Sequence, residues 1–127
     1  MKMNMKCTDI CLVTNDVPRL RAFYETVFGG KAAGDDFHCG LAVGGMGFTF
    51  VHADTLRGIP SFHYASADGV KNVIVSFDVN DVDAEHKRLL ALGVQMLNEP
   101  TTHPWGARSF QFKDPDGNIL NFRTLAR

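Results

Sequence analysis

The chain has 127 residues, of which 45% are hydrophobic, and a formal net charge of −1. This length and composition suit one ordinary domain with a proper apolar core, 1–127, and leave no room for a second one. Charges of both signs are interspersed, which excludes the basic surface of a nucleic-acid-binding protein and an acidic disordered tail. We therefore expect the partner to be a small molecule or a second copy of the chain.

The cysteines and the hydropathy pattern indicate where the protein works. Cys7, Cys11 and Cys39 form no CxxC motif, and residues 1–6 lack the apolar stretch of a secretion signal. We interpret these cysteines as reduced thiols in a cytoplasmic protein. No apolar segment approaches the roughly 20 residues of a membrane-spanning helix, so no membrane partner is expected.

The first predicted elements are a strand and an amphipathic helix. Ile10 and Leu12 alternate with less apolar neighbours, as in a strand. Asp16 is a favoured helix N-cap, and Pro18 suits the first turn of the helix that follows. Gly29-Gly30 ends this helix. Apolar residues recur at helical spacing within it, at Leu20, Phe23, Tyr24, Val27 and Phe28.

The same arrangement recurs in the second half of the chain. After Asn72, a strand is predicted from the alternation of Val73, Val75, Phe77 and Val79. Asp81 then caps a second helix, which Gly93 ends, with apolar residues at Val82, Leu89, Leu90 and Leu92. The tripeptide Asn-Asp-Val occurs at both helix starts, and its aspartates, at positions 16 and 81, are 65 residues apart. This spacing of about half the chain indicates a duplicated module and not a many-copy solenoid.

Each half ends in predicted strands joined by turns. In the first half these strands cover about 37–43 and 48–51, around a glycine-rich turn at 44–47. In the second half they cover 94–97, 109–112 and 119–122, with the turn Asp114-Pro115-Asp116-Gly117 before the last one. Residues 53–70 are predicted as a loop with room for one short irregular segment, and they are a candidate lid. The modules are thus expected at about 7–53 and 72–125, with a linker at about 54–71.

These elements together resemble a known superfamily. The strand, the Asn-Asp cap and the helix ending in an aromatic residue and Gly-Gly, followed by the motifs at 104–108 (PWGAR) and 114–118 (DPDGN), are similar to the glyoxalase/bleomycin-resistance/dioxygenase (vicinal oxygen chelate) superfamily. The resemblance covers nearly the whole chain and is most specific at 104–118. It implies an α+β fold with two βαβββ modules that form a curled, mixed-sheet cup, helices on the convex side and a ligand in the concavity. It also implies that two modules form the cup together, often with one module from each chain of a dimer.

A homodimer is expected for a second reason, which is that each sheet leaves an open edge and exposed edges tend to be paired or covered.

The resemblance also implies positions for a metal site. The superfamily's metal enzymes carry ligands on the first and last strands of each module, and these positions correspond to Asp9, Ile74 and Asn121. Only Asp9 is a plausible anionic ligand. The usual Lewis-acid chemistry of the superfamily is therefore not expected in this chain.

The fourth metal position belongs on the predicted strand at 48–51. Successive side chains of a strand point to opposite faces, so if Phe48 and Phe50 pack under the helices, Thr49 and Val51 face the cup. Thr49 is the best equivalent of the ligand. Divalent transition metals need three or more imidazole, thiolate or carboxylate ligands, so this set is a poor one. We expect no metal ion and no other cofactor.

The histidines offer an alternative, unorthodox metal site, because imidazole is a common ligand. No pair of them has the i, i+4 spacing of ligands on a helix, and His86 lies on the apolar stripe of the second helix, where a boundary histidine with satisfied hydrogen bonds is the simpler interpretation. His63 and His103 are the two that most need testing. The five histidines are His38, His52, His63, His86 and His103.

Three further residues have two interpretations each. Trp105, the only tryptophan, is either a stacking wall for a planar ligand or a plug or dimer contact at the open end of the cup. Arg108 either clamps an anionic ligand or pairs with a carboxylate near the turn at 114–116, which we favour. Cys11 shares the strand parity of Asp9 and so faces the cup, as an inert thiol more readily than as a nucleophile.

The sequence favours a metal-free small-molecule binding protein, similar to the bleomycin-resistance branch, which sequesters an organic ligand without transforming it. Competing hypotheses are a metal-dependent lyase, isomerase or dioxygenase with atypical ligands, a metal-free isomerase with Asp9 as base, and a scaffold that binds nothing. The predicted ligand-binding residues form a mostly neutral, hydrogen-bonding wall and comprise Asp9, Cys11, Thr49, Ser76, Trp105, Gln111 and Asn121.

Overall fold

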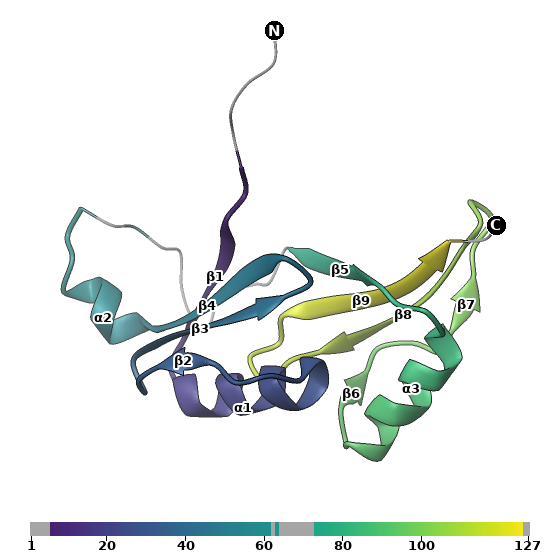
Figure 1. The fold of residues 1–127 in the computed structure, drawn as a ribbon, viewed down its shortest axis with the longest axis horizontal. Helices are drawn as coiled ribbons and strands as arrows, with labels where there is room; N and C mark the ends of the chain where they lie inside the picture. Colours follow the sequence, from purple (N-terminus) through teal and green to yellow (C-terminus); the bar gives the residue numbers. More distant parts are fainter. Residues whose placement is uncertain (1–5, 62, 64–72, 126–127) are drawn as a thin grey trace, which may run out of the picture. The chain divides into compact units, whose positions relative to one another are not determined.

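The computed structural model describes residues 6–61, 63 and 73–125 of the chain. The chain divides into an N-terminal unit, Met1–Gly69, and a C-terminal unit, Val70–Arg127. Within the described residues, each unit holds a mixed sheet, of four strands in the first and five in the second, with helices beside it (Figure 1). The α+β fold class is therefore confirmed, with sheets that do not close into barrels.

The N-terminal unit begins where the sequence predicts a strand followed by a capped helix. Asp16 Oδ1 accepts a hydrogen bond from the backbone N–H of Arg19 at 3.1 Å, which fixes the helix start. The sheet order is β1-β4-β3-β2, in which only the β1–β4 pair is parallel. The elements are β1 (Asp9–Thr14), α1 (Val17–Phe28), β2 (Ala33–Gly34), β3 (His38–Val43), β4 (Met46–His52) and α2 (Ala53–Arg57).

The C-terminal unit repeats this plan. Asp81 Oδ1 accepts from the backbone N–H of Ala84 at 3.0 Å, and the first strand is again parallel to the last. The sheet order is β5-β9-β8-β6, with β7 also paired to β8. The elements are β5 (Ile74–Asp78), α3 (Val82–Ala91), β6 (Gln95–Met96), β7 (Thr101–Thr102), β8 (Ala107–Lys113) and β9 (Ile119–Leu125).

The core of the N-terminal unit lies between α1 and β4. The ring of Tyr24 contacts the rings of Phe48 and Phe50, with centroids 5.5 and 5.0 Å apart. Both phenylalanines are buried and Thr49 between them is not, so the predicted alternation is confirmed. Val51, which was expected to face the cup together with Thr49, is also buried. Helix α2 follows β4 directly.

Helix α2 corrects the prediction of an irregular loop from residue 53 onward. His52 Nδ1 accepts a hydrogen bond from the backbone N–H of Asp54 at 3.0 Å and so caps this short helix. Much of the predicted linker, at residues 62 and 64–72, lies outside the described residues. The module boundaries therefore stay a prediction.

The core of the C-terminal unit lies between α3 and the inner face of β8 and β9. The helix residues that face this core are Val82, His86 and Leu89, at i, i+4 and i+7. His86 is 8% exposed, and its ring meets that of Phe110 edge-on, with centroids 5.0 Å apart. The sheet side of the core consists of Phe110, Phe112, Leu120 and Phe122, all buried.

His86 lies at the boundary of the core as expected, but the expectation that its hydrogen bonds are satisfied is wrong, because its buried Nε2 has no hydrogen-bond partner among the described residues and the nearest carboxylate oxygen, of Glu99, is 3.6 Å away. Leu90 and Leu92, two of the apolar residues named for this helix, are not part of the core. Leu90 lies one residue beyond the buried stripe, and Leu92 is the C-cap residue that follows α3. Their exposed fractions are 53% and 47%.

The turn between β8 and β9 depends on a buried carboxylate. Asp114 Oδ1 accepts from the backbone N–H groups of Asp116 and Asn118, both at 2.9 Å, and its Oδ2 accepts from Asn118 Nδ2 at 2.7 Å. Gly117 has a φ of 84°, which favours glycine. The carboxylate thus accepts hydrogen bonds from backbone N–H groups of its own segment, which agrees with the prediction of a turn here.

We predict that two neighbouring leucines of α3 differ sharply in their contribution to stability. Leu89→Ala removes a fully buried side chain and should lower the free energy of unfolding by about 2–5 kcal/mol. Leu90→Ala, the matched control on the exposed face, should change it by about 0.5 kcal/mol or less. Urea unfolding followed by far-UV circular dichroism measures both values. Equal losses for the two variants would contradict the assignment of the helix face.

Candidate functional site

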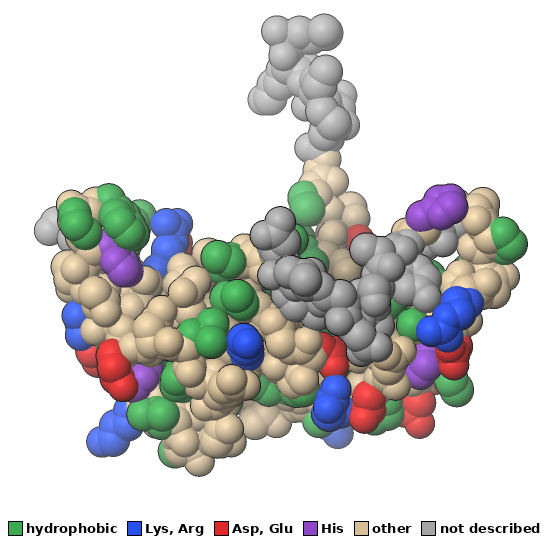
Figure 2. All heavy atoms as spheres, turned by 180° about the vertical axis from the view of Figure 1, so that it is seen from behind, with side chains coloured by type: hydrophobic (Ala, Val, Ile, Leu, Met, Phe, Trp, Pro, Cys, Tyr) green, Lys and Arg blue, Asp and Glu red, His purple; other side chains and the backbone are tan. Residues whose placement is uncertain are grey.

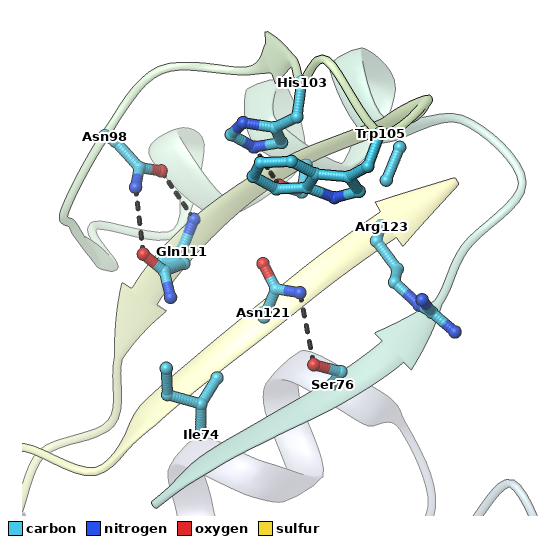
Figure 3. A pocket seen from close by; sticks show the side chains of 10 residues that line it. Ile74, Ser76, Asn98, His103, Trp105, Gln111, Asn121 and Arg123 are labelled. Carbon is cyan, nitrogen blue, oxygen red and sulfur yellow. Dashed lines mark hydrogen bonds between the residues drawn. The ribbon is translucent and has the colours of Figure 1, made fainter. Parts of the chain in front are cut away.

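A pocket lies on the face of the C-terminal sheet that is turned away from the phenylalanine core (Figure 3). Its volume is about 460 Å³, which lies within the range of small-molecule sites. Strands β5, β8 and β9 supply its floor, and the residues between β6 and β8 supply its wall. The lining residues are Ile74, Ser76, Asn98, His103, Trp105, Ala107, Ser109, Gln111, Asn121 and Arg123.

The wall of the pocket is a stacked pair of aromatic rings. The imidazole of His103 and the indole of Trp105 are parallel within 1°, with centroids 4.4 Å apart. His103 Nε2 and Ser109 Oγ share a hydrogen bond of 2.9 Å, which fixes the imidazole relative to β8. Figure 2 shows hydrophobic side chains and a histidine gathered at the upper left, over the turn between β7 and β8.

The same turn holds the stacked pair in place through its backbone. The N–H of His103 donates to the carbonyl of Ala107 at 2.8 Å, and the N–H of Gly106 donates to the carbonyl of His103 at 2.9 Å. Trp105 nevertheless remains 73% exposed. The role of Trp105, as a stacking wall or as a plug or dimer contact, stays a prediction.

The floor of the pocket is a row of hydrogen-bonding side chains. Ser76, Asn121 and Gln111 are register partners across β5, β9 and β8. Asn121 Nδ2 donates to Ser76 Oγ at 3.2 Å, and Asn98 Nδ2 donates to Gln111 Oε1 at 3.1 Å. The backbone N–H of Gln111 also donates to Asn98 Oδ1 at 2.7 Å, which ties the loop after β6 to the floor.

Arg123 supplies the positive charge of the pocket. It lies two residues after Asn121 on β9, and its register partners are Ser109 on β8 and Asp78 on β5. Arg123 Nε donates to Asp78 Oδ1 at 2.9 Å. Sequence reasoning missed this residue, although its strand parity is the same as that of Asn121 and could have indicated it.

The predicted site residues fall into two groups, one in each unit. Within a group the residues lie close together. Four line the pocket of the C-terminal unit: Ser76, Trp105, Gln111 and Asn121. The other three, Asp9, Cys11 and Thr49, belong to the N-terminal unit, on the neighbouring strands β1 and β4. Sequence reasoning did not predict the other lining residues as ligand-binding: Arg123, Asn98, Ala107 and Ser109, together with Ile74 and His103, which it considered only as metal positions.

In the N-terminal unit the carboxylate of Asp9 is engaged by hydroxyl groups. Thr49 Oγ1 donates to Asp9 Oδ2 at 2.9 Å, and Thr8 Oγ1 donates to Asp9 Oδ1 at 3.0 Å. Cys11 is the register partner of Thr49 and is exposed, as its parity predicts. Partial burial of its thiol, and secondly the charge of Asp9, raise the pKa of Cys11. A raised pKa keeps the thiol protonated at neutral pH, which supports the interpretation of Cys11 as inert.

Arg108 does not serve the pocket. Its Nε and Nη2 donate to the two carboxylate oxygens of Asp83 at 2.9 and 2.7 Å, and its Nη1 donates to Thr102 Oγ1 at 3.1 Å. The hydrogen bonds from Arg108 lower the pKa of Asp83, and in return the pKa of Arg108 is raised. Pairing with a carboxylate is thus confirmed, but the expected partner near 114–116 is wrong.

The residues at the superfamily's metal positions do not fit a divalent transition metal. Ile74 has no donor atom, and the amide of Asn121 is a hydrogen-bond donor to Ser76. Asp9 is the single carboxylate of the set, and threonine hydroxyls occupy its oxygens. Within the part of the chain that the structure describes, no cluster of three or more His, Cys, Asp or Glu side chains has the arrangement of a metal site.

No helix among the described residues combines the length and apolar character needed to cross a membrane. The cytoplasmic location and the homodimer stay predictions.

Comparisons with known proteins agree with this architecture. Residues 7–122 match the family model described as the Glyoxalase/Bleomycin resistance protein/Dioxygenase superfamily. No match was found among the curated proteins.

Three solved structures illustrate the similarity of fold. A glyoxalase/bleomycin resistance protein/dioxygenase from Nocardioides has 23% sequence identity and a TM-score of 0.81, over 100% of this chain and 87% of that one. A family enzyme of the same description from Burkholderia phytofirmans PsJN has 20% identity and a TM-score of 0.79, over 95% and 99%. TioX from Micromonospora sp. ML1 has 23% identity and a TM-score of 0.74, also over 95% and 99%. At these identities the likeness shows the fold alone.

We predict that Asp9 suppresses the reactivity of Cys11. Asp9→Asn removes the neighbouring negative charge and should lower the pKa of Cys11, although burial, the larger cause of its raised pKa, remains. Alkylation of Cys11 by iodoacetamide at pH 8 should therefore become faster, because the thiolate is the reactive form. Mass spectrometry of the labelled peptide measures the rate, with Asp36→Asn as the control. An unchanged rate in Asp9→Asn would refute the electrostatic coupling.

Proposed function

Because the chain belongs to the Glyoxalase/Bleomycin resistance protein/Dioxygenase superfamily, we propose that it binds a small organic molecule in the pocket of its C-terminal unit. The observation that carries this proposal is the exposed indole of Trp105, held parallel to His103 at the edge of a pocket with a polar floor. An exposed tryptophan costs hydrophobic free energy in the unbound protein. A ligand that covers it recovers part of that free energy.

The aromatic wall favours a planar ligand. His103 stacks on one face of the indole, and in the view of Figure 3 the indole lies between His103 and Asn121. A flat ring placed against the remaining face extends the stack in the geometry that aromatic pairs prefer. The fixed position of the turn around Gly106 means that little ordering is needed on binding.

The floor of the pocket favours a ligand with polar substituents. Ser76, Gln111 and Asn121 together present hydroxyl and amide groups that both donate and accept hydrogen bonds. Such groups orient a ligand and select against purely apolar molecules, because unpaired polar atoms in a covered pocket are costly. A planar heteroaromatic or substituted aromatic compound meets both requirements.

We propose further that binding needs no metal ion. Glyoxalase- and dioxygenase-type reactions use a bound metal as Lewis acid or redox centre, and Asp9, Thr49, Ile74 and Asn121 are an unsuitable donor set for it. This chemistry of the donor atoms favours ligand sequestration over a metal-dependent lyase, isomerase or dioxygenase.

A planar probe should report directly on Trp105. Because Trp105 is the only tryptophan, a 1H–15N spectrum contains one indole N–H signal, and titration with 2-naphthamide should shift it. Trp105→Ala should weaken binding of this probe in calorimetry by about 1–3 kcal/mol, since a stacking contact and its burial are both lost. Phe37→Ala, which removes an exposed aromatic ring from the N-terminal unit, is the control and should leave the affinity unchanged. If the probe binds without moving the indole signal, the site is elsewhere.

The metal content provides a separate test. Elemental analysis of the purified protein should find well under one transition-metal ion per chain, because the donor set is poor. About one bound Zn, Ni, Mn or Fe per chain, lost in Asp9→Ala, would instead establish a metal site with atypical ligands.

A further inference from the structure

The charge of the pocket lining differs from that of the whole chain. The chain has a formal net charge of −1. Among the ten lining residues, however, Arg123 carries a positive charge, His103 is the other titratable group, and there is no Asp or Glu. A partly enclosed site with one sign of charge attracts ligands of the opposite sign. The lining therefore favours an anionic substituent on the ligand.

Arg123 is among the residues that line the pocket, and in Figure 3 its side chain leaves β9 toward β5, away from Trp105. Its Nε donates to Asp78 Oδ1 at 2.9 Å on the neighbouring strand β5. A guanidinium has five N–H donors, and four of them are on the two terminal nitrogens. These four match the two oxygens of a planar carboxylate in a bidentate pair.

Asp78 is a weak competitor for this role. Its side chain is 72% exposed, against 40% for Arg123, and exposed ion pairs contribute little free energy because water and salt screen them. A ligand carboxylate that displaces water inside the pocket meets less screening. Arg123 can therefore keep Asp78 on its Nε side and bind a second anion with its terminal nitrogens.

The spacing along β9 relates the charge to the polar floor. Asn121 and Arg123 are two residues apart on the same face of the strand, which corresponds to about 7 Å. Trp105 lines the same pocket as both. An aromatic ring system with a directly attached carboxylate is long enough to contact the floor and the guanidinium together.

We propose that the ligand is an aromatic carboxylate, with its ring against Trp105 and its carboxylate on Arg123. This inference rests on the proposed function, because it names the ligand class of the same pocket. Arg123 then determines the specificity for a carboxylate, through its positive charge and the planar arrangement of its N–H donors.

The test compares two probes of nearly equal shape, 2-naphthoate and neutral 2-naphthamide, by isothermal titration calorimetry. The wild-type protein should bind the carboxylate about tenfold or more tightly than the amide, as expected for a charge-assisted bidentate pair. Arg123→Gln should abolish this preference, so that the affinities of the variant for the two probes lie within about twofold of each other. Arg123→Lys, which keeps the charge and loses the fork, should retain an intermediate preference.

A matched control separates local contact from net charge. Arg108 is also paired with an aspartate, Asp83, in the same unit but does not line the pocket. Arg108→Gln makes the same change in net charge and should keep the preference for the carboxylate. Asp78→Asn, which removes the competing anion, should strengthen binding of the carboxylate a few-fold without affecting the amide.

The outcomes distinguish this inference from the proposed function. Equal affinities for the two probes, or a preference that survives Arg123→Gln, overturn the inference and leave small-molecule binding intact. A preference lost equally in Arg108→Gln shows a general charge effect and also overturns it. If neither probe binds or shifts the indole signal of Trp105, the proposed function fails, and the inference fails with it.

Discussion

The alternation of side chains along β8 and β9 is the constraint on which the C-terminal unit depends. Phe110, Phe112, Leu120 and Phe122 point to α3 and are buried, so the residues between them must point to the opposite face. Those intervening positions carry Ser109, Gln111, Asn121 and Arg123, which line the pocket. Burial of the apolar side chains on one face of these strands thus also determines which side chains face a ligand on the other.

Much of the fold follows from local signals that are strong in the sequence. The two helix starts could be predicted because Asp16 and Asp81 each precede an apolar stripe, and both form the expected cap hydrogen bonds. The short strands β2 and β7 could not, because two residues contain no periodicity and neither lies within a longer apolar segment, as β6 does at 94–97. Leu90 was misplaced because a leucine one position off the stripe looks apolar in sequence but faces solvent.

In the candidate site, too, residues on strands could be predicted from the sequence, whereas a residue in a loop could not. Parity indicated Ser76, Gln111 and Asn121, and all three line one pocket. Asn98 lies in a loop, where side-chain direction depends on tertiary hydrogen bonds such as those to Gln111, and no sequence pattern indicates it. Arg123 has the strand parity of Asn121 and could have been predicted, but it lies two residues beyond the last metal position of the superfamily.

The turn around Asp114 has a consequence for how this unit can diversify. Its buried carboxylate and Gly117 set the register of β8 against β9. A slip of one residue would exchange the two faces of a strand and turn its aromatic side chains outward. With the register locked, the outward positions can mutate almost independently of the inward ones. New ligand preferences can therefore evolve by point substitution on one face, without an accompanying redesign of the core.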